Sequence, residues 1–214
     1  MSQERTVDVI SDVICPWCYI GKRRLEQAIA TFDRPQDVRV RWHPFELNPA
    51  MPKEGILRKQ YRTQKFGSWE RSLELDAKLS EVGEAEGIHF AFGKMERTPN
   101  TVDAHRLIWL ADQHACQDAV VEALFQAYFT DALDISDRPT VIDVVAGAGL
   151  DRNAAETLLS GDQAMDVIVS AKERSQRYGV EGVPFFIIDQ KITLSGAQPA
   201  ETFLEALCQT NHRE

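Results

Sequence analysis

The sequence predicts an α/β fold in which an all-helical insertion interrupts a small sheet domain. Apolar runs typical of strands occur near both ends of the chain, at 7–14 and 183–188, whereas residues 53–178 show mostly helical spacing. Neither end could bury the core of a sheet alone, so the two ends must meet. Residues 1–52 and 179–214 are therefore expected to form one discontinuous domain, and residues 53–178 an insertion domain.

Composition and charge indicate an ordinary globular protein. Of the 214 residues, 43% are hydrophobic and 27% are charged. The net charge of −9 leaves no basic stripe for nucleic acid, so nucleic acid is not an expected partner. The polar residues 1–6 and the short apolar run after them predict neither a signal peptide nor a membrane span, which favours a cytoplasmic location. In that reducing compartment a close cysteine pair is more often catalytic than structural.

The first strand and the first helix meet at a Cys-x-x-Cys motif. Residues 7–14 predict a buried strand, and the apolar residues that follow recur at helical spacing: Leu25, Ala28, Ile29 and Phe32. Pro16 is tolerated in a first helical turn, where its missing N–H would have no partner. Cys15 should thus face unpaired N–H groups and the positive end of the helix dipole, which favour a thiolate. Cys18, one turn further on, is placed to attack a mixed disulfide on Cys15.

A dithiol redox site is the preferred interpretation of this pair, because Cys-x-x-Cys at the strand–helix junction of a βαβ unit is a thioredoxin-like motif. Half of a zinc site is one alternative, but zinc needs four ligands, and Cys116 and Cys208 are isolated. Two ordinary core cysteines are another. No metal is therefore expected, and Cys116 and Cys208 are expected to be inert small hydrophobic residues.

The remaining elements follow in order. Val38, Val40 and Trp42 alternate with polar residues and predict a strand parallel to the first. Prolines then mark a loop at 44–52. Within the insertion, helical spacing predicts helices at 56–61, 69–82, 107–111, 120–129, 139–146, 153–159 and 163–178, with an extended piece at 88–92 and a loop at 97–101. After two glycines, a strand at 183–188, a hairpin turn, a strand at 192–194 and a helix at 199–208 complete the fold.

Other residues near the motif have two interpretations each. Asp12 could relay a proton to Cys18 or could cap the strand end. Trp17 could be an aromatic platform for substrate or could cover the helix end. A histidine at the position of Trp17 would supply a cationic partner for the thiolate. Without it, the protein is expected to be a less extreme oxidant than one with a histidine-containing motif.

Basic residues after the motif are expected to form a solvated helix face: Lys22, Arg23 and Arg24. The other histidines show no metal spacing and are expected to be structural or solvated: His43, His89, His114 and His212.

Several motifs together resemble the DsbA-like thioredoxin superfamily. They are Cys-Pro-Trp-Cys at 15–18, the helical insertion, and Gly-Val-Glu-Gly-Val-Pro at 179–184. More narrowly, the segments 11–21, 97–101, 104–107 and 195–198 resemble its FrnE branch. The resemblance implies a thioredoxin fold with a cis Val183–Pro184 bond beside the cysteines, where the Val183 backbone could pair with an extended substrate. It also implies that Asn100 and His105 face the active-site cleft, although a turn residue and a core histidine are the plainer interpretations.

The resulting hypothesis is a thiol-disulfide oxidoreductase or isomerase. Cys15 would be its nucleophile and Cys18 its resolving thiol, and its substrate a disulfide-containing protein or a small thiol. Related 2-hydroxychromene-2-carboxylate isomerases and kappa-class glutathione transferases carry serine in place of Cys15, so its presence favours disulfide chemistry. Residues 196–198 lack the acidic glutathione-gripping segment of the kappa class. This departure argues against tight glutathione binding and leaves glutathione open as a reductant or co-substrate, and no tightly bound cofactor is expected.

Two other classes remain as alternatives. One is a glutathione-dependent isomerase or transferase of an aromatic or polyketide-like small molecule, which would bind in an apolar pocket lined by Phe90, Phe92 and Trp109. The other is a binding or holdase module in which Cys15 and Cys18 only switch the shape of the protein.

Overall fold

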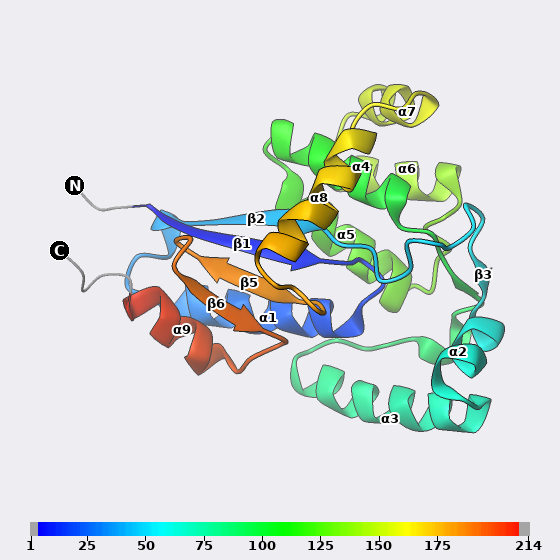
Figure 1. Ribbon diagram of the computed structural model, residues 1–214, viewed down its shortest axis with the longest axis horizontal. Helices are drawn as coiled ribbons and strands as arrows, with labels where there is room; N and C mark the ends of the chain where they lie inside the picture. Colours follow the sequence, from blue (N-terminus) through cyan, green and yellow to red (C-terminus); the bar gives the residue numbers. More distant parts are fainter. Residues whose placement is uncertain (1–3, 210–214) are drawn as a thin grey trace.

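The computed structural model describes residues 4–209 and contains a mixed four-stranded sheet (Figure 1). Its strands are β1 (Arg5–Ser11), β2 (Val38–Pro44), β5 (Phe185–Ile188) and β6 (Ile192–Ser195). Their order is β2-β1-β5-β6, with β1 parallel to β2 and antiparallel to β5. The first and last parts of the chain thus share one sheet, which confirms the predicted α/β thioredoxin fold with inserted helices.

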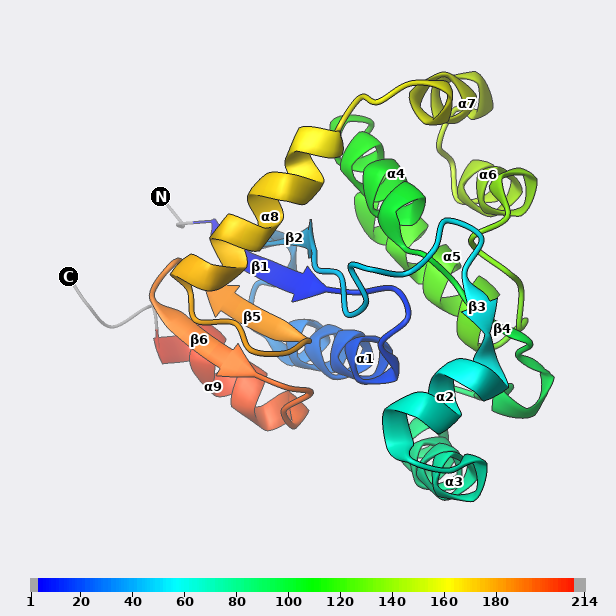
Figure 2. The ribbon, with the colours of Figure 1, turned by 45° about the vertical axis from the view of Figure 1, so that its right-hand side comes forward.

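Helices cover both faces of this sheet. α1 (Pro16–Thr31) and α9 (Ala200–Gln209) pack side by side on one face, and α8 (Met165–Arg177) crosses the other (Figures 1 and 2). Val7 and Val9 of β1 are fully buried in the main core, while Ile10 belongs to a smaller cluster with Phe185 and Ile187. The alternation arises because successive strand side chains point to opposite faces.

The β1–α1–β2 unit has the predicted parallel pairing of its two strands. Val7 lies opposite Val40, and Val9 opposite Trp42. A 3-10 turn, η1 (Pro35–Asp37), leads from α1 into β2. Trp42 is buried, and its indole N–H donates to Asp118 Oδ1 at 3.0 Å, so β2 is tied to the insertion.

The insertion is helical, as expected. Its helices are α2 (Arg58–Phe66), α3 (Trp69–Ala85), α4 (Val102–Gln113), α5 (Gln117–Phe129), α6 (Arg138–Gly147), α7 (Arg152–Ser160) and α8. Side chains of Ser68, Asp137 and Asp151 cap three of them by accepting a backbone N–H. The apolar stripe of α5 is buried, which confirms its assignment to the core.

Two short segments differ from the sequence-based expectation. Residues 88–91 belong to no strand and lead into a 3-10 turn, η2 (Phe92–Lys94); the Ala91 N–H bonds to the Phe129 carbonyl, and Phe90 stacks on Phe92. The expected helix at 56–61 and loop at 97–101 each begin as a two-residue strand. β3 (Ile56–Leu57) and β4 (Arg97–Thr98) pair antiparallel.

The C-terminal hairpin follows the prediction. β5 and β6 pair antiparallel, and the turn between them places Asp189 and Gln190 at positive φ.

None of the helices within residues 4–209 has the length and apolar character that a membrane crossing requires.

Candidate active site

The two cysteines lie at the start of α1. Cys15 is the N-cap residue and Pro16 the first helical residue, so the backbone continues from an extended conformation directly into the helix. The Cys18 N–H donates to the Cys15 carbonyl at 2.9 Å, which holds the second cysteine one turn inside the first. Both are free thiols; Cys15 is 5% exposed and Cys18 only 1%. Trp17 between them is 43% exposed and is the aromatic surface next to the pair.

Cys15 meets the other end of the chain at Val183. Its Sγ lies 3.4 Å from the Val183 carbonyl oxygen, to which the thiol can donate. The Val183–Pro184 peptide bond is cis, as the family resemblance implied. α1 packs closely beneath it: a Cβ on Gly21 would lie 3.1 Å from Pro184 Cγ and 3.1 Å from the Phe186 ring. The Gly196 N–H bonds to the Pro184 carbonyl at 2.8 Å and fixes the same turn.

Cys18 is a buried, protonated thiol. Burial raises the pKa of Cys18 well above the usual thiol value, and the adjacent Cys15 sulfur raises this pKa further. Hydrogen bonds from the Ser11 side chain and the Asp12 backbone only partly oppose this rise. At neutral pH Cys18 therefore needs a base before it can attack another sulfur.

Asp12 and His105 form a buried polar pair behind the cysteine motif. Asp12 is fully buried and accepts the Leu47 N–H at 2.8 Å. His105 from α4 is 2% exposed; its Nε2 lies 3.0 Å from the Phe45 carbonyl and 3.4 Å from Asp12 Oδ1. The pair thus links the insertion to the loop before Cys15. The role of His105 in substrate contact and that of Asp12 as a proton relay stay predictions.

Glu46 belongs to the same polar group but was not singled out from the sequence. Burial raises the pKa of Glu46, the charge of His105 lowers it, and the Asp12 carboxylate adds to the rise. Glu46 lies in the loop after β2, where the only sequence signals are turn residues. Its proximity to Asp12 follows from the register of β1 against β2, which no local pattern reveals.

Asn100 lies at the start of α4. Its amide donates to the Met51 carbonyl at 2.8 Å, and its Oδ1 accepts the Val102 N–H at 2.9 Å. The side chain therefore closes a turn, as the plainer interpretation expected. It also lines a polar hollow with Asp103 and Arg106, and a contact with substrate stays a prediction.

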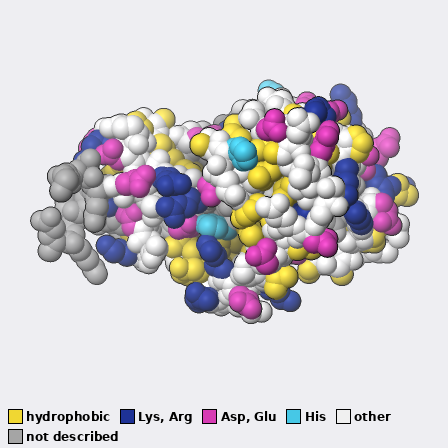
Figure 3. Space-filling view, turned by 90° about the horizontal axis from the view of Figure 1, so that it is seen from above, with side chains coloured by type: hydrophobic (Ala, Val, Ile, Leu, Met, Phe, Trp, Pro, Cys, Tyr) yellow, Lys and Arg dark blue, Asp and Glu magenta, His cyan; other side chains and the backbone are white. Residues whose placement is uncertain are grey.

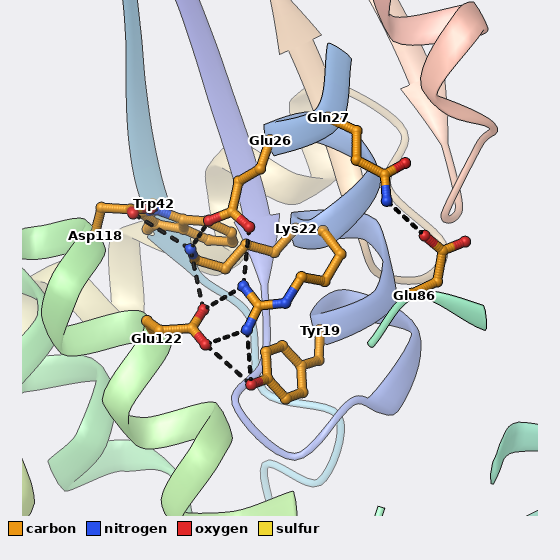
Figure 4. A network of polar contacts seen from close by, with 9 residues as sticks. Tyr19, Lys22, Glu26, Gln27, Trp42, Glu86, Asp118 and Glu122 are labelled. Atoms are coloured by element: carbon orange, nitrogen blue, oxygen red, sulfur yellow. Dashed lines mark hydrogen bonds and ion pairs between the residues drawn. The ribbon is translucent and has the colours of Figure 1, made fainter. Parts of the chain in front are cut away.

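The basic residues after the motif do not form a solvated face, so that expectation was wrong. Lys22 is 2% exposed and pairs with Glu26, Asp118 and Glu122. Arg23 also pairs with Glu122, and the Tyr19 hydroxyl bonds to the same carboxylate at 2.9 Å (Figure 4). Burial raises the pKa of Tyr19 to about 12, so its phenol stays a donor. Because Asp118 and Glu122 lie on α5, this network anchors the redox helix to the insertion.

The remaining cysteines and histidines fall outside the site. Cys116 is partly buried, whereas Cys208 on α9 is exposed, and that both are inert stays a prediction. His43 and His89 pair with Asp8 and Glu84, His114 is exposed, and His212 lies outside the described residues. Within residues 4–209, no three His, Cys, Asp or Glu side chains are grouped so that they could hold a metal ion.

Comparison with known proteins places the chain in a family. The family model described as a DSBA-like thioredoxin domain matches residues 6–208. The crystal structure of a probable DsbA oxidoreductase from Streptomyces coelicolor has a TM-score of 0.90 and 32% identity, covering 98% of this chain and 92% of that one. The uncharacterised protein YwbO of Bacillus subtilis (strain 168) is 27% identical over 202 residues, or 94% of each chain.

A more distant structure is similar in fold alone. The cytosolic disulfide reductase DsbM from Pseudomonas aeruginosa, solved with GSH, has a TM-score of 0.68 and 18% identity, and the match covers 96% of this chain and 99% of that one.

Proposed function

Because the chain belongs to the DSBA-like thioredoxin domain family, we propose that it is a thiol-disulfide oxidoreductase acting through Cys15 and Cys18. The observation that carries the proposal is the position of Cys15: its sulfur lies at the tip of α1, within 3.4 Å of the Val183 carbonyl, with Cys18 one turn behind. The Val183 backbone beside the thiol would pair with an extended disulfide-containing polypeptide. Trp17, the exposed aromatic residue, would pack against that substrate.

The proposed reaction has two exchange steps. The Cys15 thiolate attacks one sulfur of the substrate disulfide, forms a mixed disulfide and releases the other sulfur as a thiolate, which takes up a proton. Cys18 then gives its proton to a base and attacks the Cys15 sulfur, which forms the Cys15–Cys18 disulfide and releases the second substrate thiol. Two electrons pass from the protein to the substrate. In a cytoplasmic setting, two glutathione molecules would return them, becoming glutathione disulfide.

The aromatic residues of the insertion favour this chemistry over the small-molecule isomerase. Phe90 stacks on Phe92 with ring centroids 4.7 Å apart and packs edge-on against Phe129 at 5.4 Å. Phe92 is buried, and Trp109 packs against the same core. Phe92 lies in the interior, and the half-buried Phe90 and Trp109 pack against it, so these rings belong to the core and not to the apolar pocket that the isomerase alternative requires.

Insulin reduction tests the proposal. With glutathione as the electron donor, we expect the wild-type protein to precipitate the insulin B chain at least about ten times faster than glutathione alone, since an exchange enzyme supplies a positioned thiolate. The rate is followed by turbidity, with dithiothreitol as a second donor. A rate at the glutathione background with both donors would contradict the proposal.

The buried Asp12 carboxylate is proposed as the base for Cys18. An Asp12→Asn variant keeps an acceptor for the Leu47 N–H but cannot take a proton. We expect resolution of the mixed disulfide to slow roughly ten-fold or more. Burial raises the pKa of Cys18. The resolution rate of this variant should therefore climb with pH into the alkaline range, where hydroxide can remove the Cys18 proton in place of Asp12. Stopped-flow measurement of a preformed mixed disulfide gives both quantities.

The matched control for this prediction is Asp33→Asn, which removes an exposed carboxylate just beyond α1. It should leave the resolution rate and its pH profile unchanged. If Asp12→Asn behaves like this control, Asp12 is a structural residue only.

A further inference from the structure

An arginine-lined hollow lies on the face of the sheet that α8 crosses. It has a volume of about 470 Å³ and is lined by residues of β1, β2, α4, α8 and the β5–β6 hairpin. On the face of the molecule seen in Figure 3, basic side chains gather beside a histidine. The four arginines of this hollow, here called the arginine pocket, are Arg39, Arg41, Arg174 and Arg177.

The arginines converge from elements far apart in sequence. Arg39 and Arg41 lie two residues apart on the edge strand β2, so their side chains share one face. Arg174 and Arg177 come from the last turn of α8. Within residues 4–209, Arg39, Arg41 and Arg177 have no carboxylate within ion-pair distance. Three of the four guanidinium groups at the hollow thus form no close ion pair within residues 4–209.

The acidic residues of the hollow do not balance this charge. Asp8 is already bound by His43, whose Nε2 lies 2.6 Å from Asp8 Oδ1, while His43 Nδ1 lies 3.1 Å from Arg174 Nη1. A proton on Nε2 lets His43 donate to Asp8 and accept from Arg174 at once. The pKa of Asp8 would be raised by burial but is held below its usual range by His43, Arg41 and Arg174.

The two carboxylates of the hollow, Asp8 and Asp112, offset only two of its four arginines, so the hollow is positive in a chain whose net charge is −9.

We propose that the arginine pocket binds a compact polyanion that carries two or more phosphate groups. Guanidinium groups match phosphate oxygens with paired N–H donors, and several of them around one concave site favour linked phosphates over a single carboxylate. The volume lies in the range of small-molecule sites. Tyr178, 40% exposed at the end of α8, offers a ring on which a base attached to the phosphates could stack. Bound phosphates would join α8 to the edge strand β2.

Calorimetric titration with tripolyphosphate tests the proposal. The wild-type full chain should bind one equivalent at low ionic strength, with an affinity that falls as salt rises. An Arg41→Gln, Arg177→Gln double variant should bind at least ten-fold more weakly, and Arg39→Gln alone, whose exposed side chain forms no ion pair among residues 4–209, at least three-fold more weakly. A titration with adenosine triphosphate separates the sources: tighter binding than tripolyphosphate identifies a nucleotide, and equal binding identifies the phosphate chain alone.

The control is Arg71→Gln with Arg152→Gln, which removes the same charge from exposed sites on α3 and α7. It should weaken tripolyphosphate binding less than two-fold. Absence of saturable binding to the wild type, or equal weakening in the pocket and control variants, would overturn the proposal. Insulin reduction and circular dichroism check that every variant is folded.

Discussion

A Cys15→Ser variant is expected to reduce insulin only at the glutathione background rate. A serine hydroxyl at this position is far less acidic and less nucleophilic toward sulfur than a thiolate, so no mixed disulfide can form. The substitution changes one atom, and its neighbours, Pro16 and the Val183 carbonyl, keep their places. The loss should therefore appear in turnover and not in thermal stability. Turbidity and a melting curve recorded on the same sample separate the two.

Cys18→Ser should behave differently. The first exchange still occurs, but the buried resolving thiol is absent, so the Cys15 mixed disulfide accumulates. Turnover is expected to fall at least ten-fold, and a covalent adduct that dithiothreitol removes should appear on non-reducing gels and by mass spectrometry.

Cys208→Ser is the control for both variants, since it removes an exposed thiol outside the site and should keep the wild-type rate. If Cys15→Ser retains that rate, Cys15 is not the nucleophile. If Cys18→Ser retains it without an adduct, the resolving role of Cys18 is wrong.

Local signals were sufficient to predict where the cysteine motif lies in the fold. Pro16 after a buried apolar strand predicts a helix start, and the structure places Cys15 at that N-cap. The helices of the insertion followed from apolar spacing, because each buries one stripe against its neighbours. The cis bond at Pro184 followed only from the family resemblance, since a proline at a strand start has an ordinary interpretation.

What the sequence could not predict depends on tertiary contacts. β3 and β4 have two residues each, too few to show any periodicity. The Asp12–His105 pair joins the segment after β1 to helix α4, and no pattern near either residue indicates the other. Lys22 was misassigned because three basic residues in a row are typical of a surface. Its carboxylate partners Asp118 and Glu122 are about 100 residues away along the chain.

Lys22→Met is expected to destabilise the protein by about 2–3 kcal/mol. Methionine keeps most of the buried volume but removes the charge, so Asp118 loses its cation, and Glu26 and Glu122 keep only Arg23. Removing one member of a buried ion pair costs about 3–5 kcal/mol, and the partial exposure of the three carboxylates reduces that figure. Urea unfolding at pH 7 measures the change. Arg71→Met, which breaks an exposed pair with Glu74, should cost less than about 0.5 kcal/mol.

The pH dependence of this loss identifies its electrostatic part. Burial alone would raise the pKa of Glu122, but the hydrogen bond from Arg23 and the charges of Lys22 and Arg23 hold this pKa below its usual range. A carboxyl whose folded pKa is lowered stabilises the protein above its unfolded pKa, near 4.3, and this contribution is lost as pH falls through the folded value.

Burial would likewise lower the pKa of Lys22, but Asp118, Glu26 and Glu122 raise it, so its contribution is complete below about pH 10.4 and is lost as pH rises through the folded value. The difference in unfolding free energy between wild type and Lys22→Met should therefore be constant from about pH 5 to pH 9 and should shrink in acid. A difference that stays the same down to about pH 2, below the usual carboxyl range, would mean that Lys22 stabilises the fold by packing its alkyl chain and not by its charge.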